Sequence, residues 1–408
     1  MKKLIFVVIL CFVGMTLFAQ GADMSLYTAD FMRQDASFNE LLQVVQTVSD
    51  NGTTGIGDFW HACLTQLIRR IPDATTVAEL DAVEKLSVII CQKIGAERHT
   101  AAAGDLWQIS EIFDVFRTTN EAHAQSTAIT ALGQVNGAEF VPHMALRLSQ
   151  FNSQSITNAE ARRRVQEVVV ALVGALEALK DIAGFTPVFF ASIGSYDVHT
   201  RTVAHNALPN IAPDPSEPII VIIRDPDNDP RVKLAAWREM LRAEAPDASK
   251  ANVASAALAV TFSFNTTNRS FQGNLKEMRK GALDWVRRFG AADESVYVNL
   301  KRTYDSNFVN RSPDYEEISL TLTALATLRT EEASDILLGF LRELHTRRRS
   351  GPWAQKERQV YEWLIASIGN SGSQSQEMRQ LLTTITRTDS YTNQEQTMAR
   401  NALTRLGG

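Results

Sequence analysis

The sequence predicts an all-α protein of the α-α superhelix class, a solenoid built from stacked helix pairs. Three observations predict it: a pattern that recurs every 32 to 46 residues, apolar residues at helical spacing with almost no strand pattern, and turn signals between the helices. Each repeat of a solenoid contacts only its neighbours, so its length is not limited by the size of one core. A chain of 408 residues fits this class.

The recurring pattern has an anchor position, a mostly small residue three positions later and an apolar residue seven positions later. The anchors are Gln125, Val165, Arg201, Lys233, Arg279, Ile318, Arg358 and Gln396, at intervals of 40, 36, 32, 46, 39, 40 and 38 residues. The apolar residues are Leu132, Leu172, Leu208, Met240, Val286, Leu325, Ile365 and Leu403. A fixed period in this range is typical of helical solenoids.

The first residues have the pattern of an export signal. Lys2 and Lys3 precede an apolar run from Leu4 to Phe18, and small residues follow from Ala19. We therefore predict a secretory signal peptide over residues 1–19. The run spans about 22 Å as a helix, short of a bilayer core of roughly 30 Å, so we expect no stable membrane anchor. The mature chain is predicted to be periplasmic or secreted.

The next residues fit the period poorly. Residues 20–57 are predicted to hold one amphipathic helix, from Phe38 to Val48, and a flexible linker around Gly52. Residues 58–104 are predicted to form atypical N-terminal capping helices near 58–71 and 76–95, because the terminal repeats of a solenoid need a polar outer face. Residues 105–408 are predicted to form the repeats, closed by a unit at 392–406.

The clearest repeat lies at residues 216–241. A first helix is expected at Ser216 to Ile223, then a turn rich in Asp and Pro, then a second helix from Arg231 to Leu241. Asp229 is a good N-cap and Pro230 suits the first helical position. The residue pair Ala235 and Ala236 lets the second helix pack closely against its neighbours.

These residues resemble a HEAT repeat, including the bacterial HEAT-like variety, and the resemblance covers roughly Asp105 to Leu406. A second copy lies at Asp197 to Leu208. Four anchors depart from the family's basic residue at this position, and armadillo and other helical-repeat solenoids remain alternatives. The residues that carry the resemblance are Asp229, Pro230, Val232, Lys233, Ala235, Ala236 and Leu241, and Asp197, Val198, Arg201, Ala204, Ala207 and Leu208.

Two cysteines, Cys63 and Cys91, remain after removal of the signal. They fall on helices that are expected to be neighbours, and an oxidising compartment permits a disulfide between them. The alternative is a pair of buried thiols that act as small apolar residues. No Cys-x-x-Cys or nearby His pair accompanies them, so no metal site is predicted.

Charge and motifs limit the function. Loss of Lys2 and Lys3 with the signal changes the net charge from −5 to −7, which argues against nucleic acid as a partner. The sequence contains no His-Glu-x-x-His, Gly-x-Ser-x-Gly or phosphate-binding glycine loop. The acidic stretch from Asp225 to Asp229 has Pro230 where an EF-hand needs glycine. We therefore predict no catalytic residue, metal or cofactor.

The predicted function is an exported scaffold or protein-binding protein without catalysis of its own. In the family that the chain resembles, second helices line the concave side, and charged residues there could contact an acidic partner segment. A second candidate surface is a run of three arginines beside Trp353, expected in a loop. The candidate residues are Arg231, Lys233, Arg238, Arg279, Arg287, Arg288, Arg347, Arg348, Arg349, Trp353 and Arg358.

Two alternatives stay open at this point. One is an enzyme accessory, or a lyase of the kind that some HEAT-like proteins resemble. The other is a binder of a periplasmic glycan or small molecule, which a deep aromatic-lined pocket would favour.

Overall fold

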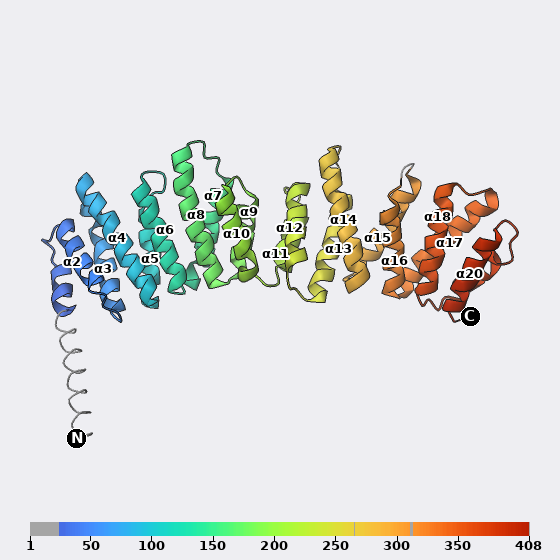
Figure 1. Cartoon of the computed structure of the whole chain (residues 1–408), viewed down its shortest axis with the longest axis horizontal. Helices are drawn as coiled ribbons and strands as arrows, with labels where there is room; N and C mark the ends of the chain where they lie inside the picture. Colours follow the sequence, from blue (N-terminus) through green and yellow to red (C-terminus); the bar gives the residue numbers. More distant parts are fainter. Residues whose placement is uncertain (1–23, 265, 311–312, 408) are drawn as a thin grey trace, which may run out of the picture. The chain divides into compact units, whose positions relative to one another are not determined.

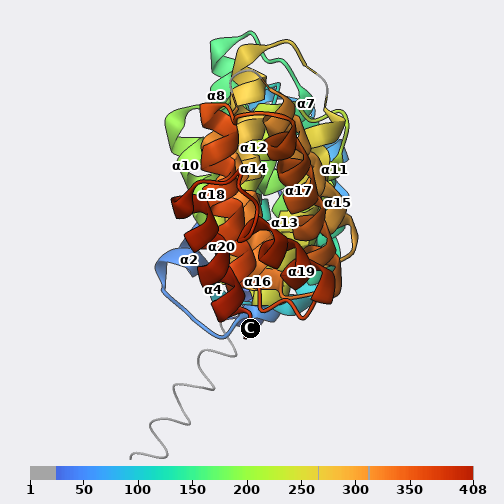
Figure 2. The same cartoon turned by 90° about the vertical axis from the view of Figure 1, so that its right-hand side faces the viewer.

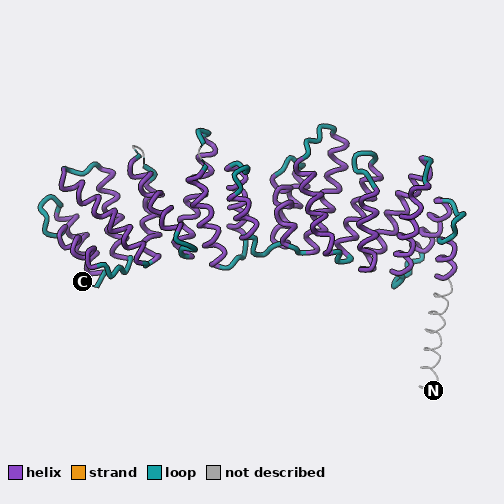
Figure 3. Tube along the Cα trace, turned by 180° about the vertical axis from the view of Figure 1, so that it is seen from behind, coloured by secondary structure: helices purple, strands orange, loops and turns teal. Residues whose placement is uncertain are grey.

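The computed structural model describes residues 24–264, 266–310 and 313–407, and the fold is all-α (Figure 3). No strand occurs in these ranges. None of the helices within them combines the length and apolar character that a membrane span requires. The predicted signal peptide, residues 1–19, lies outside the described residues.

The chain divides into two compact units, Met1–Pro213 (unit 1) and Asp214–Gly408 (unit 2). Within each unit, the helices stand side by side in chain order (Figure 1). Unit 1 contains α2 (Phe38–Asp50), α3 (Gly57–Arg70), α4 (Val77–Glu97), α5 (Ala103–Ile112), α6 (Thr119–Gln134), α7 (Val141–Ser153), α8 (Ala159–Leu179), α9 (Phe185–Ile193) and α10 (Val198–Ile211). Unit 2 contains α11 (Ser216–Arg224), α12 (Pro230–Arg242), α13 (Asp247–Ser263), α14 (Arg269–Phe289), α15 (Ser295–Val309), α16 (Tyr315–Leu328), α17 (Glu331–Ser350), α18 (Gln355–Asn370), α19 (Gln376–Ile385) and α20 (Asn393–Arg405).

Each unit has two layers of helices. From α3 onward, every odd-numbered helix packs on the even-numbered helix that follows it. The even-numbered helices also pack on one another in order, α2 to α10 in unit 1 and α12 to α20 in unit 2. Viewed from the end of unit 2, α18 and α20 lie on one side and α15, α17 and α19 on the other (Figure 2). We call the even-numbered helices second helices, because each closes a helix pair.

The N-terminal helices lie where the sequence predicts them. The helix predicted from Phe38 is α2, and the two predicted near 58–71 and 76–95 are α3 and α4. Residues 24–31 are also helical, which the sequence did not indicate. The turn after α2 contains Gly52 and Gly55, at φ +64° and +78°, a conformation that favours glycine.

Polar side chains cap the second helices. Asp229 adopts an extended conformation and its Oδ1 accepts hydrogen bonds from the amides of Arg231 and Val232, at 2.7 and 3.2 Å. Pro230 occupies the first helical position, where its missing N–H costs nothing. The predicted start of this helix is confirmed. The side chains of Thr76, Thr118, Asn158, Asp197, Asn268, Asp314 and Thr392 cap other second helices in the same way.

The eight copies of the sequence pattern fall on the eight second helices α6 to α20. The residue three positions after each anchor is fully buried in every copy, whether it is Ala128, Thr321 or Tyr361. The residue seven positions after is buried in every copy except the last, where Leu403 is half-buried. The pattern therefore marks the inner side of each second helix.

At three of the anchors, Gln125, Lys233 and Gln396, the side chain fastens a second helix to the helix before it. The amide nitrogen of Gln125 donates to the carbonyls of Ser110 and Phe113 at the end of α5, at 2.7 and 3.1 Å. Gln396 donates to two carbonyls just after α19. Carbonyl groups at a helix end have no partner within the helix, so these donors satisfy groups that would otherwise be unpaired.

Small residues set the spacing of second helices in unit 1. A Cβ added to Gly133 of α6 would lie 2.8 Å from the Cα of Ala175 in α8. A Cβ added to Gly95 of α4 would lie 3.1 Å from the Cα of Ala131 in α6. Neither position can hold a larger residue without moving a neighbouring backbone.

Unit 2 instead joins α12 and α14 through aromatic rings. Trp237 of α12 is buried, and its ring lies 4.7 Å from that of Trp285 in α14. A Cβ added to Gly281 would come within 2.9 Å of the Trp237 ring. Glycine at this position leaves room for an indole rather than for a helix backbone.

Candidate partner-binding surface

Three adjoining cavities follow the second helices of unit 1. The largest, about 470 Å³, lies between α6 and α8, and the next, about 300 Å³, lies between α4 and α6. Ser126, Thr130 and Gln134 line both. A third cavity of about 210 Å³ involves α2, α4 and α6, and His123 lines it together with the second. The shared residues make the cavities one groove, which we call the unit 1 groove.

Small and uncharged side chains line most of the unit 1 groove. On α8 the lining includes Val170, Gly174 and Ala178 at four-residue spacing, with Glu167 one turn earlier, and also Ala171 and Ala175. On α4 it includes Gln92 and Ala96. Because these side chains are short, the surface between neighbouring second helices stays hollow.

A polar group of three residues lies where the cavities meet. The Nδ1 of His123 lies 2.8 Å from Oε1 of Glu167, and the hydroxyl of Ser126 lies 3.1 Å from the same oxygen. A carboxylate only accepts hydrogen bonds, so the imidazole donates from Nδ1. This hydrogen bond fixes the orientation of the imidazole ring, and His123 lines the groove.

This group does not have the geometry of a nucleophilic relay. The second contact of the Ser126 hydroxyl is the backbone carbonyl of His123 at 2.9 Å, not the imidazole. A serine nucleophile needs the imidazole within hydrogen-bond reach of its oxygen. The arrangement is suited to holding a ligand rather than to acyl transfer.

Glu84 gives the third cavity an acidic wall. Its side chain lines the cavity although only 9% of the residue is exposed, and Thr118 Oγ1 donates to it at 3.5 Å. Burial raises the pKa of the Glu84 carboxyl. A hydrogen bond from Asn120 lowers this pKa, but the nearby charges of Glu121 and Asp81 raise it, so the pKa stays above its ordinary value.

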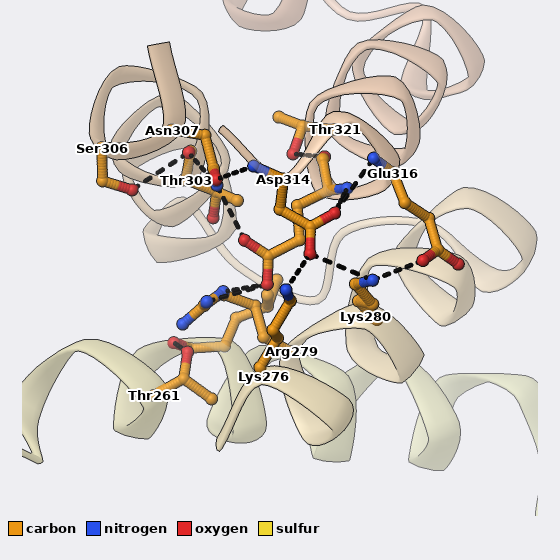
Figure 4. Close-up of polar contacts among 12 residues, drawn as sticks. Thr261, Lys276, Arg279, Lys280, Thr303, Ser306, Asn307, Asp314, Glu316 and Thr321 are labelled. Atoms are coloured by element: carbon orange, nitrogen blue, oxygen red, sulfur yellow. Dashed lines mark hydrogen bonds and ion pairs between the residues drawn. The ribbon is translucent and has the colours of Figure 1, made fainter. Parts of the chain in front are cut away.

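The second helices of unit 2 carry a network of charged side chains instead (Figure 4). Glu317 of α16 is buried, and it accepts hydrogen bonds from Arg279 of α14 at 2.9 Å and from Asn307 of α15 at 2.7 Å. Arg279 also lies over the ring of Phe262. Three consecutive helices are thus joined through one buried carboxylate.

Asp314 forms the second centre of this network. It caps α16 and pairs with Lys276 and Lys280 of α14, and Lys280 also pairs with Glu316. Burial raises the pKa of Asp314, but hydrogen bonds from Lys276, from the Glu317 amide and from Lys280 outweigh it and lower the pKa to about 2. The carboxyl is ionised under all ordinary conditions.

Most of the arginines predicted to contact a partner have partners within unit 2. Arg231 pairs with Asp229, its own helix cap, and Arg238 of α12 pairs with Glu277 of α14 at 2.7 Å. The remaining pairs are Arg279 with Glu317, Arg287 and Arg288 with Asp284, Arg347 with Glu343 and Glu357, and Arg348 with Glu395. Within the described part of the chain, Arg349 and Arg358 are exposed and form no ion pair.

Lys233 does not lie on an exposed face. It is 1% exposed, and its Nζ donates to the carbonyls of Ile223 and Asp225 at the end of α11. Lys233 therefore has the same role as Gln125. The prediction that Lys233 binds a partner is wrong, because the side chain is buried within unit 2. Burial lowers the pKa of Lys233, partly offset by Asp225.

The predicted surface loop around Trp353 is also corrected. Arg347, Arg348 and Arg349 lie in the last turn of α17. Positive charges at this end of a helix interact favourably with the negative end of the helix dipole. Trp353 is buried, 4.6 Å from the ring of Tyr361, and Arg348 stacks over it. Trp353 and Arg348 therefore pack into the last helix pairs rather than form an exposed anchor.

Cys63 of α3 and Cys91 of α4 are buried free thiols in the structure. Burial raises the pKa of both thiols. In the ranges that the structure describes, no group of three or more His, Cys, Asp or Glu side chains could hold a metal ion.

The unit 1 groove was not predicted from the sequence. The predicted partner-binding residues do not include His123, Glu84 or Glu167. His123 and Glu167 lie 44 residues apart, close to one repeat interval. A search for polar residues separated by one period would have paired them.

No protein-family model and no curated protein matches this chain. Among solved structures, one described as a crystal structure of an engineered protein aligns with 95% of this chain and 99% of its own, at 15% identity and a TM-score of 0.33. A similarity this weak carries no conclusion about fold or function.

Proposed function

We propose that this protein is an exported α-solenoid of the HEAT-like kind that binds a segment of another protein and has no catalytic step of its own. Helix pairs stacked in two layers within each unit support the solenoid. The pattern of residues 1–19 supports export to the periplasm or beyond.

The observation that carries the binding function is the unit 1 groove. Its hollows recur from one second helix to the next. Packed helices lie about 8–10 Å apart, and an extended chain covers that distance in about three residues at roughly 3.3 Å each. Successive side chains of a bound segment can therefore enter successive hollows.

Charge favours a protein over nucleic acid as the partner. The residues that line the groove include one basic side chain, Lys85, and two acidic ones, Glu84 and Glu167. Lys85 is already paired with Asp81 at 2.7 Å. Such a surface repels phosphate groups.

Two exposed glycines of unit 1 give a matched test. A photo-reactive benzoylphenylalanine replaces Gly174 of α8, which lines the groove, or Gly104 of α5, on a first helix. A Cβ at either position meets no atom within 4 Å, so both variants should fold. Irradiation in the cells of origin, followed by mass spectrometry, reads out the cross-linked protein.

We expect a discrete protein to cross-link from position 174 and not from position 104. Equal capture from both positions would indicate random encounter. No capture from position 174 would contradict partner binding in the groove.

A further inference from the structure

We propose that the cavity at Glu84 receives the ammonium group of a lysine side chain on the partner segment. This inference rests on the proposed function and names the chemistry that one hollow of the unit 1 groove recognises.

The first argument is an acidic group without a compensating charge. Glu84 is nine-tenths buried, and no cation of the described residues forms an ion pair with it. Lys85, which lines the same cavity, pairs with Asp81, and Arg117, which precedes Thr118 in the chain, pairs with Glu121 at 3.5 Å. Buried carboxylates are ordinarily paired, so this one is expected to gain a cation when the groove is occupied.

The second argument is the shape of the cavity. Its volume of about 210 Å³ suits a single side chain rather than a drug-sized ligand, for which about 300–1,000 Å³ is usual. Val88 and Ile89 of α4 provide apolar walls, and Gln46 of α2 and Asn120 of α6 provide amide groups. A site with apolar walls and one carboxylate matches the two parts of a lysine side chain.

The third argument separates lysine from arginine. An ammonium group is a compact charge with three donors that point in different directions. One carboxylate with amide oxygens from two other helices can satisfy those donors. A guanidinium group prefers two parallel acceptors in one plane, and Glu84 already accepts hydrogen bonds from Thr118 and Asn120.

The burial of Glu84 supports the same conclusion. The folded protein holds this carboxyl at a pKa above the ordinary value, because burial, Glu121 and Asp81 disfavour its charge. A bound ammonium would oppose all three effects. The ligand that relieves them most directly is a cation.

The probes are blocked peptides Ac-Ala-Gln-Ala-X-Ala-Gln-Ala-NH2 in which X is lysine, acetyl-lysine or norleucine. Each is titrated into the full mature chain while methyl NMR signals of Val88 and Ile89 are recorded. We expect the lysine peptide alone to shift these signals. Glu84→Gln should weaken its affinity about tenfold, because a hydrogen bond to a charged group is lost.

Glu97→Gln is the matched control. It removes the same charge from the same helix, and Glu97 lines none of the three cavities. Its affinity for the lysine peptide should equal that of the unmodified chain.

Three results would overturn the inference: equal shifts from the norleucine peptide, unchanged affinity in Glu84→Gln, or no shift from any peptide. Shifts from free 1,5-diaminopentane without shifts from the lysine peptide would also overturn it, because the site would then take a small amine. Partner capture at position 174 does not depend on Glu84, so it separates failure of this inference from failure of the proposed function.

Discussion

The second helices of the two units carry the same sequence pattern, but they contact one another differently. In unit 1 they approach through glycine and alanine and leave hollows between them, as at Gly133 and Ala175. In unit 2 aromatic rings and charged pairs join α12, α14 and α16, as at Trp237 and at Glu317, whereas α18 and α20 approach through Gly369 and Ala402. The buried residues on the inner side of each second helix produce the recurring sequence pattern. The exposed residues determine whether the surface between two second helices is hollow or is covered by side chains that pair with one another.

The charges of the two units differ accordingly. Residues 20–213 contain 21 acidic and 13 basic side chains, whereas residues 214–408 contain 25 acidic and 26 basic ones. The near balance in unit 2 allows its acids and bases to pair across helices. The acidic excess in unit 1 leaves carboxylates such as Glu84 without a counter-ion and favours a cationic partner.

The largest expected effect is in the charged network of unit 2. Glu317→Ala removes the partner of Arg279 and of Asn307, and we expect the free energy of unfolding to fall by about 3 kcal/mol. The measurement is urea unfolding followed by tryptophan fluorescence. A loss below about 1 kcal/mol would mean that the network holds unit 2 together no better than a surface ion pair does.

A pair of glycine substitutions tests the packing of unit 1. Gly133→Ala should destabilise the protein by about 2 kcal/mol, because its Cβ would meet the backbone of Ala175. Gly174→Ala should stabilise it by about 0.5–1 kcal/mol, since the added Cβ meets nothing and the unfolded chain loses freedom. Thermal unfolding of both variants checks the prediction, and effects of the same sign would contradict it.

Glu84→Gln should stabilise unit 1 in a pH-dependent way. The raised pKa means that the folded state binds more protons than the unfolded state above the ordinary glutamate pKa, so stability falls as pH rises through this window. At pH 7 the variant should be more stable by about 1 kcal/mol.

The difference between the two proteins should shrink as the pH falls below about 4.3, the ordinary glutamate pKa. The neighbouring groups Glu121, Asp81, Lys85 and His123 are present in both proteins, so the difference isolates Glu84. Unfolding free energies at pH 4 and pH 7 provide the measurement. A less stable variant at pH 7 would show that Glu84 serves the fold rather than the groove.

The smallest expected effect is at Arg238. Its ion pair with Glu277 joins α12 and α14, but both side chains are more than half exposed. Solvent screens such pairs, so Arg238→Ala should cost no more than about 0.5 kcal/mol, and high salt should remove the difference. A loss comparable with that of Glu317→Ala would mean that exposed and buried pairs of unit 2 act as one network.

The period and the caps made most of the fold predictable. Asp229 and Pro230 define where α12 begins, and burial of the third residue after each anchor follows from helical geometry. The division after Pro213 was not predicted, since the pattern continues from Arg201 to Lys233 without a break. The period of the sequence pattern shows where each repeat lies, but it does not show how extensively neighbouring repeats contact each other.

The site residues were harder to predict, because long side chains reach beyond their own helix. Lys233 extends to the carbonyls of α11, and Trp353 turns into the core despite its glycine and proline neighbours. One signal was available but unused: the pairs that join second helices lie about one period apart. Their separations are 39 residues for Arg238 and Glu277, 38 for Arg279 and Glu317, and 36 for Lys280 and Glu316.

The central claim is that partners dock on the second helices of unit 1 and not on those of unit 2. Gly174 of α8 and Gly273 of α14 are both exposed, and a Cβ at either meets no atom within 4 Å. Benzoylphenylalanine at these two positions, in otherwise identical chains, allows the cross-linking yields to be compared in the cells of origin. We expect one discrete cross-linked protein from position 174 and background from position 273. A discrete protein from position 273 with background from position 174 would contradict the claim.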